Sequence, residues 1–160
     1  MRNVWAYIGT AAAAIAITGG SALLAAPQRA AAAAGRVVAM TADDTMKYSM
    51  PVIQAKKGET LTIKLTSKGT LPKEAMAHNF VLLVKGTNPD DFAMQSAMAK
   101  ATDYIPEKLK DKIIAHSKLA GPGETVEVTF KVPAVPGSYM YLCSFAGHYA
   151  AGMKGTLVVQ

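Results

Sequence analysis

Two segments of the chain alternate apolar and polar residues with a period of two. In the first, Leu61, Ile63 and Leu65 are separated by threonine and lysine; in the second, residues 126–132, valine and phenylalanine alternate with threonine and charged residues. This period places apolar side chains on one face of a β-strand and polar side chains on the other, as a sheet over a hydrophobic core requires. The pattern therefore predicts β-structure with one buried face.

Three apolar runs extend the β pattern along the chain. Residues 80–84 are continuously apolar, which favours a central strand, and residues 139–143 and 156–159 are predicted to form the last two strands. Turn signals rich in glycine, proline and lysine lie at residues 56–59, 121–123 and 133–137. Several short strands separated by such turns predict an all-β fold, a β-sandwich.

Residues 90–114 depart from this pattern, because their apolar residues follow a helical period. Asp90 or Asp91 is expected to cap the first helix, and Pro106 to begin a second short turn. We interpret the segment as a helical flap inserted between two strands, not as a second domain. Its methionines are expected to fill the core rather than to bind metal.

The first 34 residues differ in composition from the rest of the chain. Residues 4–26 are uncharged and rich in Ala, Ile and Leu, and they follow a single arginine, Arg2, which is typical of a secretory signal peptide. The run is also long enough to span a membrane. We therefore expect residues 1–34 to be a signal peptide or an N-terminal membrane tether with an Ala-rich linker, and residues 35–160 to form the folded domain. The location predicted is periplasmic or otherwise exported, with membrane attachment only through an uncleaved N-terminal segment.

The charge of the chain is mildly basic. Its formal net charge is +6, and removal of Arg2 and Arg29 with the first 34 residues leaves about +4. The lysines are scattered without a run or interleaved aromatic residues, so nucleic-acid binding is not expected. A basic surface favours an acidic redox partner or an anionic lipid.

Cys143 is the single cysteine of the chain, so an internal disulfide is impossible. In an exported domain such a thiol is buried and inert, paired with another molecule, or a metal ligand. A free accessible thiol is a liability in an oxidising compartment, which favours the ligand.

A thiol, an imidazole and a thioether lie on one short segment, Cys143-x4-His148-x4-Met153. His78, at the start of an apolar strand, is the candidate for the second imidazole; the remaining histidine, His116, is expected at the surface. Soft sulfur stabilises Cu(I), imidazole binds both oxidation states, and a weak thioether completes the ligand set of blue-copper electron-transfer sites. The pattern predicts one type 1 copper ion held by His78, Cys143, His148 and Met153.

The segments that carry these residues also resemble a known family. Residues 76–82, 113–119 and 139–157 are similar, in order and spacing, to azurin, a periplasmic blue-copper protein of the cupredoxin type. The resemblance extends from about residue 45 to residue 160. It implies an eight-stranded Greek-key β-sandwich, the cupredoxin fold, with a short helical flap between strands and with Met153 as a long axial ligand.

Two departures from azurin concern the site. The glycine that precedes the first histidine ligand in the family is Ala77 here, whose backbone carbonyl is a possible further copper contact. The spacing from His148 to Met153 is one residue longer than in azurins and resembles that of the auracyanins of photosynthetic bacteria.

The predicted function is electron transfer, not enzymatic catalysis. The protein is expected to shuttle single electrons between larger redox proteins, such as a c-type cytochrome or a copper- or haem-containing reductase or oxidase. Asn79 is expected to join the His78 strand to the Cys143 loop through Ser144. His148 is expected to expose its ring edge within a small apolar patch; the patch comprises Met76, Ala77, Ala146 and Ala150.

Two alternatives belong to other classes. A copper carrier would use the same ligands to deliver Cu(I), without a stable coloured Cu(II)–thiolate state. A hydrolase would use Cys143 as nucleophile and His148 as base. No oxyanion motif accompanies that pair, and Met153 would then have no role, so the hydrolase is disfavoured.

Overall fold

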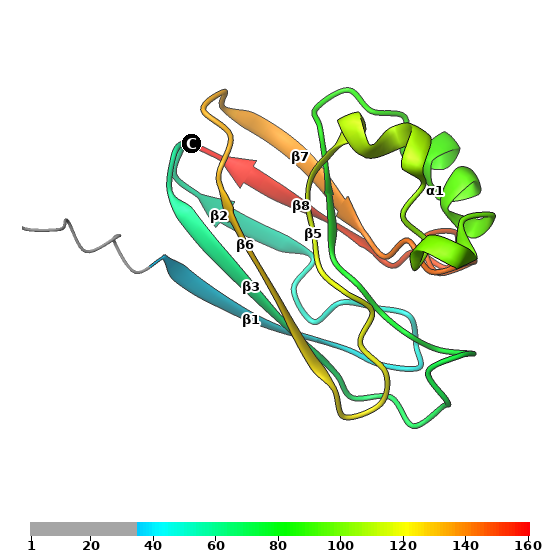
Figure 1. The fold of residues 1–160 in the computed structure, drawn as a ribbon. Helices are drawn as coiled ribbons and strands as arrows, with labels where there is room; N and C mark the ends of the chain where they lie inside the picture. Colours follow the sequence, from blue (N-terminus) through cyan, green and yellow to red (C-terminus); the bar gives the residue numbers. More distant parts are fainter. Residues whose placement is uncertain (1–34) are drawn as a thin grey trace, which may run out of the picture. The chain divides into compact units, whose positions relative to one another are not determined.

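The computed structural model describes residues 35–160. The expected signal peptide or tether at residues 1–34 lies outside the described residues. Within the described part, eight strands form two β-sheets that pack face to face (Figure 1). The three-stranded sheet has the order β1 (Arg36–Ala42), β3 (Thr60–Ser67), β6 (Thr125–Lys131). The five-stranded sheet has the order β2 (Val52–Ala55), β8 (Lys154–Val159), β7 (Gly137–Leu142), β4 (Val81–Leu83), β5 (Ile113–His116).

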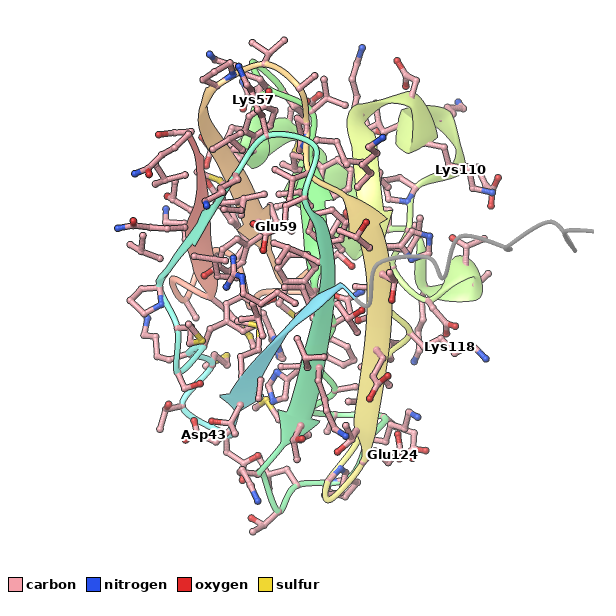
Figure 2. All side chains as sticks on the ribbon, turned by 90° about the vertical axis from the view of Figure 1, so that its left-hand side faces the viewer. Asp43, Lys57, Glu59, Lys110, Lys118 and Glu124 are labelled. Carbon is pink, nitrogen blue, oxygen red and sulfur yellow. The ribbon has the colours of Figure 1, made fainter. Side chains whose placement is uncertain are left out.

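The chain passes repeatedly from one sheet to the other; for example, the consecutive strands β1 and β2 belong to different sheets. Strand β1 is parallel to β3, β2 is parallel to β8, and the other pairs are antiparallel. This is the predicted Greek-key sandwich, in which both inner sheet faces contribute to one core. Figure 2 shows the three-stranded sheet from the front, with Lys57 at one end and Asp43 and Glu124 at the other.

The predicted alternation of apolar and polar residues is confirmed in the three-stranded sheet. Leu61, Ile63 and Leu65 are at most 1% exposed, while Lys64 between them is exposed. Strand β6 pairs with β3 in register, and its valines are only half-buried. The reason is that β6 is the edge strand of its sheet, where the facing layer covers it less completely.

Strand β4 confirms the continuous apolar run as a central strand. It lies between β7 and β5, and all three of its residues are buried. The ring of Phe80, just before β4, lies 4.9 Å from that of Tyr141 on β7. The start of β4 is therefore held by pairing with β5 and β7 on its two sides and by the packing of Phe80 against Tyr141.

The helical flap between β4 and β5 is confirmed, with corrections to its boundaries. It consists of α1 (Pro89–Ala97) and two short 3-10 helices, η1 (Lys100–Thr102) and η2 (Glu107–Lys112). The chain then enters β5 at Ile113, so the expected helical extent to Ile114 is wrong. Pro106 immediately precedes η2, as predicted. Among residues 35–160, no helix combines the length and apolar character needed to cross a membrane.

The residues within α1 differ from expectation in two ways. The cap is Asn88, whose side-chain oxygen accepts hydrogen bonds from the backbone N–H groups of Asp90 at 3.0 Å and Asp91 at 3.3 Å. The expected role of the methionines as core filler is wrong, because Met94 is 61% and Met98 77% exposed. Phe92, the one large buried residue of the helix, packs outside that core, in a second cluster of buried residues with Val81, Leu83, Ile105 and Leu142.

Candidate metal centre

One side of the candidate site is held by the sheet. His78 lies three residues before β4, where its backbone N–H donates to the Ala120 carbonyl at 3.0 Å and its carbonyl accepts from the Ala120 N–H at 2.7 Å. The residue is fully buried, and neither ring nitrogen has a hydrogen-bond partner in the described part of the chain. Burying a polar group without a partner costs free energy. Two orphaned imidazole nitrogens in this position are explained if one of them binds a metal ion.

The other side is the loop that joins β7 to β8. Cys143 directly follows β7 and Met153 directly precedes β8, and the Cys143 N–H donates to the Met153 carbonyl at 3.1 Å. Inside the loop, the Met153 N–H donates to the His148 carbonyl at 2.9 Å. Gly147 and Gly152 have φ of 84° and 93°, in the left-handed region that favours glycine, and these two residues let the loop fold back.

The fold brings the predicted donor atoms together. One ligand atom each from His78, Cys143 and His148 lies within 4.8 Å of the others. The Cys143 Sγ is 3.4 Å from the His148 Nδ1 and 3.9 Å from the Ala77 carbonyl oxygen. Met153 is fully buried in the same core cluster as Cys143. His116, by contrast, is exposed and takes no part, as expected.

Burial sets the protonation of the three donors without metal. It lowers the pKa of His148 to about 4, with a further contribution from the charge of His78, and it also lowers the pKa of His78. Burial raises the pKa of the Cys143 thiol to about 12, although the backbone N–H groups of Asn79 and Phe145 act in the opposite direction. At neutral pH both imidazoles are therefore ready to bind a metal, while the thiol must first lose its proton.

Asn79 joins the two sides of the site, as predicted. Its side-chain N–H donates to the Ser144 hydroxyl at 2.8 Å, and its side-chain oxygen accepts from the Ser144 backbone N–H at 2.9 Å. Both residues are at most 2% exposed. Buried hydrogen bonds between segments 65 residues apart in the sequence restrain the Cys143 loop against the His78 segment.

The surface near His148 corrects the predicted apolar patch. His148 is only 2% exposed and Ala77 is fully buried, so the expected exposed ring edge and the place of Ala77 in the patch are wrong. An aromatic cluster contributes to this burial, in which the tilted Phe145 ring lies 4.7 Å from the His148 ring and 4.6 Å from the Tyr104 ring of the flap. Ala146 is exposed, as expected.

Sequence reasoning missed Tyr104 as a cover for the site. The backbone at Asp103 and Tyr104 has φ of 53° and 62°, which is unusual for residues other than glycine and has no signature in the sequence. Tyr104 contacts Phe145, which in turn contacts His148, and these long-range contacts are revealed only by the folded structure.

A buried thiol and two imidazoles at the end of a Greek-key sandwich, with a buried thioether on the same loop, define the cupredoxin class of copper proteins. A structural zinc site has four strong protein ligands, whereas a weak thioether as the fourth donor is typical of a copper site.

Comparison with known proteins identifies the family. A family model for copper binding proteins of the plastocyanin/azurin family matches residues 35–160. The azurin of Pseudomonas fluorescens biotype C is 36% identical over 126 residues, covering 77% of this chain and 97% of that protein. The azurin of Pseudomonas aeruginosa is 37% identical over 145 residues, covering 86% of this chain and 92% of that protein.

Solved structures agree with this result. Auracyanin A, a "blue" copper protein from the green thermophilic photosynthetic bacterium Chloroflexus aurantiacus, has a TM-score of 0.68 and 31% identity, over 79% of this chain and 99% of that chain. The auracyanin of Roseiflexus castenholzii has a TM-score of 0.68 and 29% identity, over 78% of this chain and 96% of that chain. The chain belongs to the plastocyanin/azurin family of copper-binding proteins. Its cofactor is copper, and its function is type 1 copper electron transfer, in which single electrons pass to and from other redox proteins.

Proposed function

We propose that the copper ion of this protein is bound by His78, Cys143, His148 and Met153, with the carbonyl oxygen of Ala77 as a further contact. The closeness of the first three donor atoms and the orphaned nitrogens of His78 support this ligand set. The full burial of Met153 and the position of the Ala77 carbonyl, 3.9 Å from the Cys143 Sγ, support the two weaker contacts. Copper bound there supplies one-electron chemistry between its two oxidation states.

The surrounding residues are suited to fast electron exchange. The ligands are buried next to the ends of the inner strands β4, β7 and β8, and Asn79 joins the Cys143 loop to the His78 segment. A site whose ligands are already in place needs little rearrangement when the charge on the metal changes. Backbone N–H groups near the Cys143 sulfur reduce its electron donation, which favours the reduced form.

The protein acts as an electron carrier and not as an enzyme in its own right. Its partners are a c-type cytochrome or a copper- or haem-containing reductase or oxidase, which dock transiently near the β7–β8 loop. A groove of about 310 Å³ between α1 and this loop supports that place; Met94, Phe145 and Ala150 are among its lining residues. Residues 1–34 export the protein as a signal peptide or tether residues 35–160, the copper domain, outside the cytoplasm.

The observation that carries the proposal is the buried cluster of one thiol and two imidazoles. The test is the visible spectrum of the purified protein after addition of one equivalent of Cu(II). An intense blue absorption from charge transfer between thiolate and copper is expected. A colourless protein that binds only Cu(I) would instead favour the copper-carrier alternative.

A further inference from the structure

Tyr48 is a buried residue whose hydroxyl group forms a hydrogen bond with Asn79, the residue that joins the two sides of the metal site. We propose that Tyr48 is a positioning residue, whose hydroxyl group holds Asn79 in the orientation that joins the His78 segment to the Cys143 loop. The inference rests on the ligand set proposed above, because its effect on copper passes through Cys143.

The hydroxyl group of Tyr48 has a defined partner. The residue lies between β1 and β2, is held by a bridge to Ala42, and is 7% exposed. Its hydroxyl donates to the backbone carbonyl of Asn79 at 2.5 Å, in a buried contact between residues 31 apart in the sequence. Within residues 35–160, this carbonyl accepts no other hydrogen bond.

Asn79 uses all of its polar groups at this point. Its side chain makes two hydrogen bonds to Ser144, at 2.8 and 2.9 Å, and its backbone N–H lowers the pKa of the Cys143 thiol, against the effect of burial. The carbonyl is the one group of Asn79 that is held by a residue outside the His78 segment and the Cys143 loop. Tyr48 therefore restrains the residue that links the two sides of the site without touching a ligand through a hydrogen bond itself.

Removal of the hydroxyl should change the site in a specific way. In Tyr48→Phe the Asn79 carbonyl remains buried without a partner, which is unfavourable, so the backbone turns toward another donor or toward water. The Asn79 N–H then aligns less well with the Cys143 sulfur. Because a hydrogen bond to the thiolate lowers its electron donation to copper, its loss favours Cu(II), and the reduction potential should fall.

The chain offers a matched control in Tyr141. Its ring centroid is 5.5 Å from that of Tyr48, it is fully buried, and its hydroxyl donates to the backbone carbonyl of Met50 instead of Asn79. Tyr141→Phe removes the same chemical group from the same core. Both variants should lose thermal stability, but only Tyr48→Phe should lower the potential and shift the thiolate-to-copper absorption band.

Amide hydrogen exchange in the copper-free protein separates this inference from the ligand assignment. The Ser144 N–H donates to the Asn79 side chain, so it should exchange several-fold faster in Tyr48→Phe, after correction for global stability, and remain unchanged in Tyr141→Phe. If this exchange responds while the protein forms no blue copper site, the Tyr48 contact stands and the ligand set fails. If Tyr48→Phe matches Tyr141→Phe in both exchange and potential, Tyr48 is core packing only.

A measurement on the unsubstituted protein keeps the test valid if Tyr48→Phe does not fold. The hydroxyl proton of Tyr48 should exchange slowly with water and be visible by NMR, because it is buried in a hydrogen bond. A hydroxyl proton that exchanges as fast as that of an exposed tyrosine would overturn the proposal.

Discussion

The two sides of the copper site are built in different ways. His78 belongs to a segment whose residues, from Ala77 to Phe80, are at most 1% exposed, and its backbone is paired with Ala120 in both directions. The β7–β8 loop contains three of the four proposed ligands, yet Ala146 and Gly147 within it are exposed. The sheet thus provides a rigid side, and the loop a side that can be changed without rebuilding the core. Variation in copper chemistry is expected to arise mostly on the loop.

Loss of the thiolate should have the largest effect on the loop side. Cys143→Ser replaces the soft sulfur by a hydroxyl group of similar size, so the blue absorption should disappear completely while copper affinity falls. The fold should remain, because the sheets do not depend on the thiol; circular dichroism tests this. A Cys143→Ser protein that is still intensely blue would exclude Cys143 as the ligand.

Truncation of each histidine tests the difference between the sides directly. His148 is itself only 2% exposed, but Ala146 and Gly147 of the same loop are exposed, so His148→Gly should leave a hole near the surface that added imidazole can enter to restore a coloured copper site. His78→Gly leaves a hole under fully buried residues, and it also frees a backbone segment from its side-chain packing. Rescue should fail there, as measured by the visible spectrum during an imidazole titration. Equal rescue of both variants would show that the two sides are equally accessible.

The rigid side and the loop also differ in how much the sequence reveals. The alternation around Leu61 predicts a buried sheet face because strand period is a local property, and the run Cys143-x4-His148-x4-Met153 predicts ligands because its residues share one loop. His78 lies far from this loop in the sequence, and it could be predicted as a ligand only because a blue-copper site needs a second imidazole that the loop does not contain. Contacts such as Tyr48 with Asn79, or the aromatic cover over His148, depend on long-range packing and leave no local pattern.

The two sides of the site should also differ in the protons that they release when copper binds. At pH 7 the imidazoles are neutral, and the Cys143 thiol is protonated because its pKa is raised to about 12. Uptake of copper should therefore release about one proton per ion, all of it from the loop side, measured by pH-stat titration. Below pH 4, where His148 is protonated as well, the release should rise. No release at pH 7 would mean that the thiolate is already formed without metal.

The lowered pKa of His148 also predicts how the stability of the copper-free protein changes with pH. Because the pKa of His148 is depressed from 6.5 to about 4 in the folded protein, the unfolded chain binds more protons between these values. The free energy of unfolding of the copper-free protein should thus decrease as the pH falls from about 6.5 to about 4. Denaturant titrations across this range check the direction, and His148→Gly should show a smaller decrease.

The axial position should give the smallest effect and the finest test of the loop side. Met153→Gln introduces a harder oxygen donor that stabilises Cu(II), so the reduction potential should fall while copper remains bound. Met153→Leu removes the donor, and Cu(II) loses more than Cu(I), so the potential should rise. The stability cost of the Leu variant should stay below about 1.5 kcal/mol, since the volume is nearly conserved.

Met40 provides the control for Met153. It is a methionine of β1, 2% exposed and in the same core cluster, but it belongs to no proposed ligand set. Met40→Leu should have a similar stability cost and leave the potential unchanged, as measured by voltammetry. If the potential also stays unchanged in both Met153 variants, the thioether is core packing, and the site has three protein ligands with only the Ala77 carbonyl as a weak contact. The loop would then supply two ligands instead of three, and the difference between the two sides of the site would be correspondingly smaller.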